Sequence, residues 1–170
     1  MNRKLTLVLA TSITLACGAP PKPHGTALDG VWQIVAVDVK GSGATVHNQP
    51  QPSLVIFRGD YYSWSRVTIT SPRELFVAET PTDAERVAAY ESVLFNSGKY
   101  EVSDSTLTVW PLIARSPNYM GGASESYRYR LKGDTLWVNQ RSADVHFWLG
   151  GQLVSPSTAR ELRLVLQRLQ

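Results

Sequence analysis

"LDGVWQIVAVDV" (residues 28–39) is the first strand pattern of the chain, and it begins just after a run rich in proline and glycine. Its aliphatic and β-branched residues predict a strand over residues 31–39. On a regular strand Trp32 shares a face with Ile34 and Ala36, because side chains alternate between the two faces. A very large aromatic side chain is therefore expected to enter the core at the start of the folded unit.

The rest of the chain is a series of short β-rich segments separated by turn residues. A polar loop, GSGATVHNQPQP (41–52), is expected to hold no regular element. The final segment alternates leucines with more polar residues, which favours a strand over a helix. The predicted strands cover residues 31–39, 53–57, 61–69, 99–102, 105–113, 125–132, 135–140 and 159–170. Eight antiparallel strands with short connectors predict an all-β, up-and-down closed barrel.

One helix is predicted, between the third and fourth strands. Thr82 and Glu85 have the spacing of a capping box, and Asp83 adds negative charge at the helix N-terminus. The Asn96–Gly98 segment is expected to end the helix. The helical spacing of its apolar residues predicts one face packed on the protein; they are Ala84, Val87, Tyr90, Val93 and Leu94.

The N-terminus has the pattern of an export signal. Arg3 and Lys4 precede an uncharged segment, residues 5–16, which is too short to span a bilayer and ends just before Cys17. This segment resembles the signal of bacterial lipoproteins, which implies removal of residues 1–16 and a lipid on Cys17. Plain secretion with an incidental cysteine stays open. Residues 17–27 are then a tether, and Gly18, which is not Asp, implies by the same resemblance the outer membrane, facing the periplasm.

Charge and length limit the remaining classes. Once Arg3 and Lys4 leave with the signal, basic and acidic side chains nearly balance, so nucleic acid is not expected as a partner. Residues 28–170 fit one domain, whose core is large enough to need no disulfide. We expect a monomer attached to the cell envelope through the lipid on Cys17.

Gly30-Val31-Trp32, with a basic residue near the end of the last strand, resembles the signature of lipocalins. Four further segments resemble the bacterial lipocalin-like domain proteins: PSLVIFRGDYYSWSRV, FNSGKYEVSDSTLTVWP, IARSPNYMGG and SYRYRLKGDTLWV. The resemblance covers residues 28–169. It implies that Trp32 seals one end of the barrel against an Arg of the last strand. Arg168 has the parity of the inward Leu162, Leu164 and Leu166, so we expect Arg168 to pack on Trp32, with Gly30 part of this seal.

A small hydrophobic or amphipathic ligand is the expected partner of the barrel interior. Parity places Tyr62, Trp64, Tyr127 and Tyr129 on the inward face, whereas the facing of Trp110 stays open. Arg66 is in phase with Trp64, where it can hold a ligand carboxylate. The candidate ligand-binding residues are Tyr62, Trp64, Arg66, Trp110, Tyr127 and Tyr129. The alternative is that the rings simply fill the interior.

No enzyme is predicted. The three histidines, His24, His47 and His146, lie far apart in the sequence, and neither a metal-ligand pair nor a Gly-x-Ser-x-Gly motif is present. No catalytic residue, metal or cofactor is therefore expected, although haem ligation by His146 stays open. The function expected is non-catalytic binding or sequestration of a small hydrophobic molecule. The alternative is a protein-interaction module, such as an envelope protease inhibitor or assembly factor, that acts through its tail and rim loops.

Overall fold

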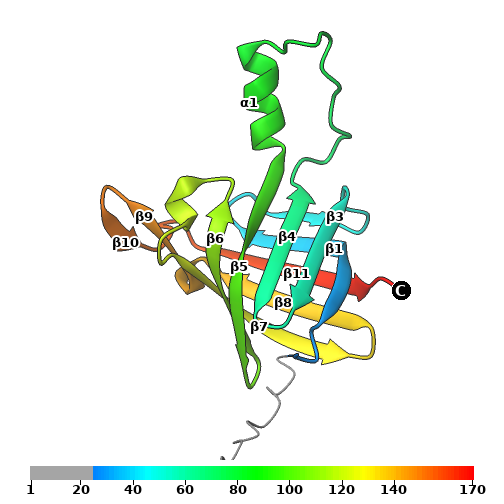
Figure 1. Ribbon diagram of the computed structural model, residues 1–170, viewed down its shortest axis with the longest axis vertical. Coiled ribbons are helices and arrows are strands. Elements are labelled where there is room, and N and C mark those ends of the chain that lie inside the picture. The colour runs from blue at the N-terminus through cyan, green and yellow to red at the C-terminus, as the bar shows by residue number, and fades with distance from the viewer. Residues whose placement is uncertain (1–24) are drawn as a thin grey trace, which may run out of the picture.

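The computed structural model describes residues 25–170, in which eleven strands, one α-helix and two short 3-10 helices are present (Figure 1). The predicted signal, the lipid site at Cys17 and most of the predicted tether lie outside the described residues. The strands are β1 (Gly30–Gly41), β2 (Thr45–His47), β3 (Ser53–Arg58), β4 (Tyr61–Val67), β5 (Val93–Ser103), β6 (Thr106–Ala114), β7 (Ser124–Lys132), β8 (Thr135–Arg141), β9 (Val145–Leu149), β10 (Gln152–Val154) and β11 (Arg160–Arg168). The helices are α1 (Asp83–Glu91), η1 (Pro117–Tyr119) and η2 (Ser142–Asp144).

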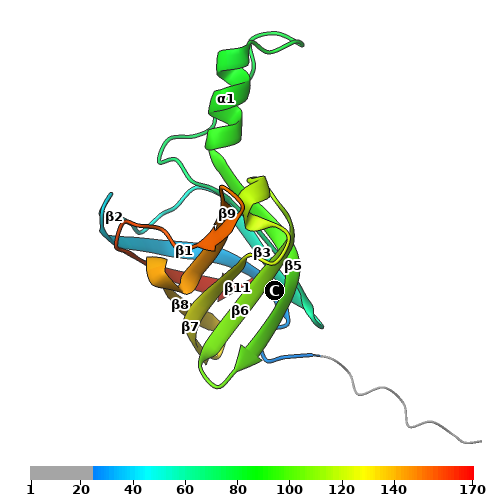
Figure 2. The same cartoon turned by 90° about the vertical axis from the view of Figure 1, so that its left-hand side faces the viewer.

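Eight of the strands close into an antiparallel barrel. The order around it is β1, β3, β4, β5, β6, β7, β8 and β11, and β11 returns to pair with both β8 and β1. Neighbours in the barrel are neighbours in the chain once β2, β9 and β10 are set aside. The closed, eight-stranded antiparallel barrel predicted from the sequence is thus confirmed (Figure 2).

Three short strands outside the barrel were not predicted. β2 forms within the loop that was expected to be irregular and pairs with the second half of β1. β9 and β10 make a hairpin that attaches to the start of β7. Each pairs over only two to three positions, which leaves too short a run for an alternating pattern to stand out in the sequence.

The predicted position and packing of the helix were wrong. The unpredicted strand β2 precedes the helix in the chain, so α1 lies between the fourth and fifth strands, β4 and β5, rather than between the third and fourth. It ends at Glu91, and Asn96–Gly98, expected to stop it, lies inside β5. No α1 residue is buried: Val87 is 55% and Tyr90 is 49% exposed. The capping box at Thr82 and Glu85 is present as predicted.

A β-bulge in β1 changes which residues face the core. The pairing of β1 with β11 shifts between Ile34 and Ala36, so the alternation restarts one residue later. Trp32 and Ile34 face inward, and after the bulge Val37 and Val39 do so. Ala36, expected on the face of Trp32, is therefore turned to the outer side of the barrel.

The two ends of the barrel are distinct. β11 ends at Arg168, beside Trp32 and the segment 27–29 that precedes β1; we call this the closed end. The opposite end, the mouth, is reached by the start of β11 at Arg160, the end of β4 and the start of β5. No helix within residues 25–170 is long and apolar enough to cross a membrane.

Candidate binding cavity at the mouth of the barrel

The closed end is sealed by Arg168 and Trp32. The guanidinium carbon of Arg168 lies 4.1 Å from the centroid of the Trp32 ring, which is completely buried. The Trp32 Nε1–H donates to the Leu28 carbonyl at 2.8 Å. Arg168 also donates to the carbonyls of Ala27, at 2.9 Å, and Asp29. The contact that the resemblance implied, with Arg168 chosen by parity, is therefore present, and it connects the start of the domain to its last strand.

Gly30 belongs to the same contact. Its φ of 142° lies in a region that side chains with a Cβ rarely adopt. A Cβ built there would also overlap Nη1 of Arg168. Glycine at this position thus lets the guanidinium lie across the indole ring.

Asp29 stabilises the closed end further. Partial burial raises its pKa, but hydrogen bonds from the backbone N–H groups of Thr26 and Gly59 and from the Tyr100 hydroxyl outweigh burial, so the net pKa is lowered. Burial raises the pKa of Tyr100 to about 12. The pair therefore remains a carboxylate and a neutral phenol at neutral pH.

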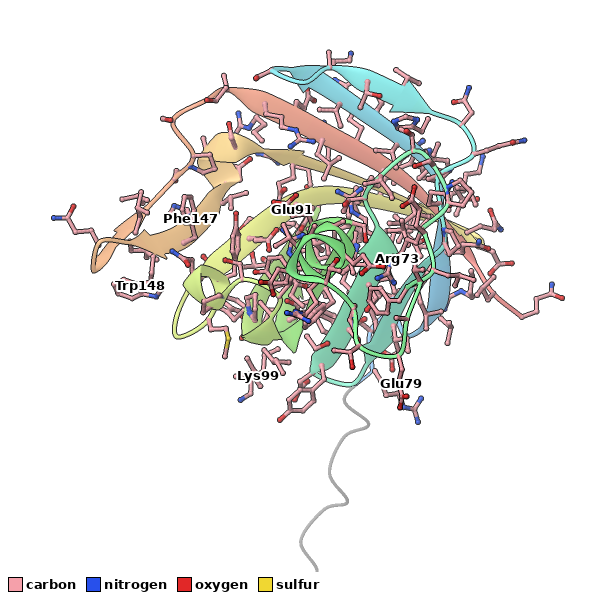
Figure 3. All side chains as sticks on the ribbon, turned by 90° about the horizontal axis from the view of Figure 1, so that it is seen from above. Arg73, Glu79, Glu91, Lys99, Phe147 and Trp148 are labelled. Atoms are coloured by element: carbon pink, nitrogen blue, oxygen red, sulfur yellow. The ribbon has the colours of Figure 1, made fainter. Side chains whose placement is uncertain are left out.

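A cavity of about 440 Å³ occupies the mouth end of the barrel. Its apolar wall comes from β4, β5, β7 and β11, where Trp64 and Tyr127 stack at 5.5 Å between ring centroids and 15° between planes. Leu94, Leu162 and Leu164 complete this wall. Tyr119 lies at the rim and stacks on Phe147 of the β9–β10 hairpin, which Figure 3 shows projecting to one side.

The polar part of the lining centres on a buried carboxylate, Glu125, which is 9% exposed. It accepts three hydrogen bonds, from Asn96 Nδ2 at 3.2 Å, Gln140 Nε2 at 3.0 Å and the Tyr127 hydroxyl at 2.8 Å. Burial, followed by the charge of Glu125 and this hydrogen bond, raises the pKa of Tyr127 well above its ordinary value. Tyr127 is therefore a neutral donor, and the carboxylate is held by three donors from three strands.

Arg66 brings a cation to the cavity. Its side chain is half-buried and lines the wall, and no hydrogen bond or ion pair to its guanidinium is found among residues 25–170. Burial and the neighbouring charge of Arg160 lower the pKa of Arg66, while Tyr127 and Glu125 act in the opposite direction. A guanidinium stays charged in proteins, so Arg66 presents unused donors to the cavity.

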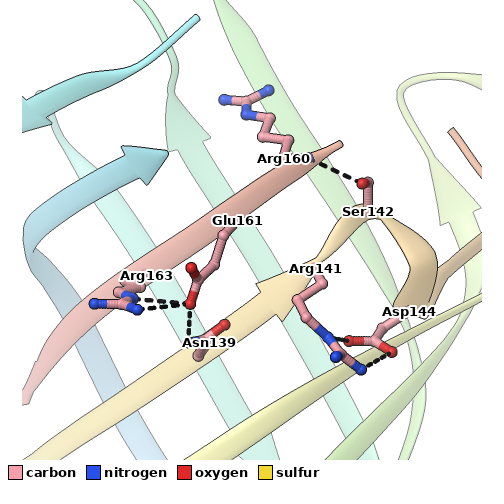
Figure 4. Close-up of polar contacts among 7 residues, drawn as sticks. All are labelled: Asn139, Arg141, Ser142, Asp144, Arg160, Glu161 and Arg163. Carbon is pink, nitrogen blue, oxygen red and sulfur yellow. Dashed lines mark hydrogen bonds and ion pairs between the residues drawn. The ribbon is translucent and has the colours of Figure 1, made fainter. Parts of the chain in front are cut away.

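The other two arginines of the lining differ in how they are held. Arg115 donates to the backbone carbonyls of Tyr90, Glu91 and Val93, so it fixes the junction of α1 with β5. Arg160 lies at the rim, where its backbone N–H donates to Ser142 and its side chain extends from β11 (Figure 4). Arg66 and Arg160 are therefore the two arginines of the lining for whose guanidinium no hydrogen bond or ion pair is found among residues 25–170.

The sequence-predicted ligand residues fall into two groups. Trp64, Arg66 and Tyr127 line the mouth cavity together. Tyr62 is 3% exposed and belongs to the core; its hydroxyl, buried without a hydrogen-bond partner among the described residues, does not reach the cavity lining. Trp110 has outward parity on β6, and Tyr129 packs on the core toward the closed end. The structure thus brings together three of the six.

Sequence reasoning missed the polar cluster of Glu125, Asn96 and Gln140. A usable signal was present for one member, because Glu125 has the parity of the inward Tyr127 on β7. Asn96 was assigned to the end of a helix, so its inward position on β5 was not considered. No group of three or more His, Cys, Asp or Glu side chains within residues 25–170 is placed to hold a metal ion.

Comparison with known proteins yields structural likeness but no family. No family model matches the chain, and no curated protein matches it. A crystal structure of an uncharacterized protein from Bacteroides eggerthii is similar over 84% of this chain and 99% of that one, at 8% identity and a TM-score of 0.40. The strand pairing of this chain itself establishes the barrel.

Proposed function

We propose that this protein binds, without catalysis, a small amphipathic molecule whose anionic group is held by Arg66 inside the mouth cavity. The observation that carries the proposal is the Arg66 guanidinium, which lines the cavity beside the stacked rings of Trp64 and Tyr127 and for which no hydrogen bond or ion pair is found among residues 25–170. A charged group held away from bulk water is costly unless it is paired. A ligand carboxylate would supply the missing partner through a charge-assisted, bidentate contact.

The size and lining of the cavity support this class of ligand. Cavities that bind small molecules typically measure about 300–1,000 Å³, and the mouth cavity falls within that range. The stacked rings of Trp64 and Tyr127 and the leucines of β5 and β11 suit a hydrocarbon or ring. Glu125 already accepts three hydrogen bonds, so it does not demand a cation from the ligand.

We further propose that the protein is a lipocalin-like lipoprotein of the cell envelope, anchored through Cys17. The Trp32–Arg168 contact at one end of an eight-stranded barrel supports the lipocalin-like assignment. Gly25, where the described chain begins, lies beside Asp29 at the closed end. A tether that leaves from this end would let the mouth face away from the membrane, open to a soluble ligand.

Displacement of a bound fluorescent probe tests the ligand. The purified chain is loaded with an anilinonaphthalene sulfonate, and dodecanoate and dodecanol, which share a chain length, are compared as competitors. We expect dodecanoate to compete at least about tenfold more strongly than dodecanol, since hydrogen bonds to charged groups are worth about 1.5–3 kcal/mol. Arg66→Gln should remove this preference, whereas Arg128→Gln, an exposed arginine outside the cavity, should keep it.

Any of three results would overturn the proposal. One is a chain that takes up neither competitor and that native mass spectrometry shows to be empty after purification. Another is an Arg66→Gln variant that still prefers the carboxylate. A preference for dodecanol in the wild-type chain would equally exclude an anion at Arg66.

A further inference from the structure

A segment at the mouth, residues 68–92, projects from the barrel as an arm made of a loop and α1 (Figure 1). Polar contacts hold it. Arg73 Nε donates to Ser92 Oγ at 3.0 Å, and Glu85 accepts from the Val77 backbone N–H at 3.1 Å as well as from Thr82. Figure 3 looks onto this arm from above, with Arg73 and Glu79 on its loop. The arm is therefore a defined structure, although it has no buried core of its own.

The arm presents apolar side chains to solvent. Leu75 is 91%, Val77 94% and Phe76 50% exposed, and they are consecutive in the sequence. Val87 of α1 is also exposed, whereas Tyr90 contacts Arg115 at the base of the arm. Single exposed apolar residues are common, but a contiguous cluster on a projecting segment marks a contact surface.

The arm is also acidic. Residues 68–92 contain the basic Arg73 and Arg86, while their acidic residues are Glu74, Glu79, Asp83, Glu85 and Glu91. Both arginines are engaged within the arm, Arg73 with Ser92 and Arg86 with Asp83. The exposed loop of the arm is thus apolar at Leu75–Val77 and negative on either side, at Glu74 and Glu79.

A groove of matching character lies on the outer face of the barrel, over β7, β8, β11, β1 and β2. It encloses about 450 Å³. Its outward apolar residues are Ala36, Val46, Trp137 and Val165, and its charged residues are Arg128, Arg130, Arg163 and Asp38. This outer groove is separate from the mouth cavity, and β1 contributes to it because the bulge turns Ala36 outward.

Two of the groove arginines are available to a partner. Arg163 is paired with Glu161 at 2.8 Å, as Figure 4 shows. Arg130 instead lies over Trp137, with 4.0 Å between the guanidinium carbon and the ring centroid. Arg128 is exposed, and no hydrogen bond or ion pair of its side chain is found within residues 25–170. Arg128 and Arg130 outnumber Asp38, so the groove carries a net positive charge beside its apolar floor.

We propose that the arm of one molecule docks in the outer groove of a second copy, with Leu75–Val77 on the apolar floor and Glu74 and Glu79 facing Arg128 and Arg130. Charge complementarity selects this occupant, because the arm is negative where the groove is positive. The acidic arm is correspondingly ill-suited to an anionic lipid surface. This association does not depend on the proposed ligand. It implies that the chain is the expected monomer only at low protein concentration.

Sedimentation velocity on the purified full chain, up to about 1 mM protein, measures the association. We expect the weight-average sedimentation coefficient to rise with protein concentration and to fall toward the monomer value in high salt, since salt screens exposed charges. Phe76→Asp should weaken association about tenfold or more, as removal of a central apolar contact does. Thermal melts establish that each variant is folded.

A charge exchange makes the test specific. R128E/R130E in the groove and E74R/E79R in the arm should each abolish association alone, and an equimolar mixture of the two variants should restore it. R58E/K99E is the matched control, because it makes the same change of charge at two exposed residues that lie outside the arm and the groove. This control should associate as the wild type does.

A photo-crosslinking residue at position 76 identifies the surface that is contacted. In a mixture of ¹⁵N-labelled and unlabelled chains, mixed-isotope crosslinks to peptides of β7, β8 or β11 are expected. A chain that stays monomeric throughout the concentration range would overturn the proposal. Association that persists in both charge variants would overturn it as well, and so would crosslinks confined to other surfaces. Binding to phosphatidylglycerol vesicles that depends on Phe76 would show that the arm contacts lipid instead.

Discussion

Arg168 shows how one side chain can hold a barrel together. It lies over Trp32, donates to the carbonyls of Ala27 and Asp29, and pairs with Asp134 at 3.3 Å, so it joins the entry segment, the first strand and the β7–β8 turn. The side chain is only 26% exposed, which strengthens the interaction of the cation with the ring. Its contribution to stability comes from these contacts together.

Arg168→Ala should therefore lower the melting temperature. The cation–π contact alone contributes about 0.5–2 kcal/mol, and the lost donors add to it. For a chain of this length the fall amounts to several degrees. Arg163→Ala, which loses only the partly exposed pair with Glu161, should change the melting temperature far less. Equal melting temperatures for wild type and Arg168→Ala would contradict the role of the seal.

Glu125 offers a second residue-scale prediction. Glu125→Ala leaves the donors of Asn96, Gln140 and Tyr127 without their acceptor, so we expect a loss of about 1–3 kcal/mol in the free energy of unfolding. Glu161→Ala is the matched control, since Glu161 accepts from Asn139 and Arg163 at a more exposed position. Urea denaturation measures both. A smaller loss at Glu125 than at Glu161 would show that solvent already satisfies the cluster.

At the scale of elements, the arm depends on polar contacts rather than on packing. Glu85 combines the capping box of α1 with a link to Val77 in the loop. Hydrogen bonds from Thr82, then from Val77, lower the pKa of Glu85 below its ordinary value of 4.5. The order of the loop is therefore tied to the ionised state of one carboxylate.

The arm should loosen in acid. Because the folded-state pKa of Glu85 is depressed, its stabilising effect is complete above pH 4.5 and is lost as pH falls through the folded value. Amide exchange of residues 73–82, corrected for intrinsic rates, should then accelerate, while that of β1 and β11 stays slow. In Glu85→Gln the exchange of the arm should already be faster at neutral pH and should vary less with acid. An arm whose protection is the same at both pH values would contradict this account.

At the scale of the whole molecule, the seal and the cavity are at opposite ends of the barrel. Bulk added at the mouth should therefore reduce ligand uptake, whereas bulk near the closed end should not. Leu94 lines the cavity, and Val102, on the same strand and also partly buried, does not. We expect Leu94→Trp to lower probe binding strongly and Val102→Trp to keep it, although both overpack the barrel by about 1–3 kcal/mol. Titration of the folded variants with the fluorescent probe measures this difference. Stronger binding by Leu94→Trp than by Val102→Trp would place the opening at the other end of the barrel.

The sequence by itself determined the barrel and its seal. Alternation along 61–67 and 160–168 is a local property that reports which face is buried, so the eight barrel strands were predictable. Parity on the last strand then selected Arg168 as the partner that the family resemblance implied for Trp32. The tertiary structure decided the rest. A bulge reverses parity within β1. The helical pattern over 82–94 ends in a strand, because at Val93 and Leu94 pairing with β4 outweighs local preference. The hydrogen bonds that Asn96 and Gln140 donate to Glu125 join strands that are separated in the chain, and no local sequence pattern encodes such contacts.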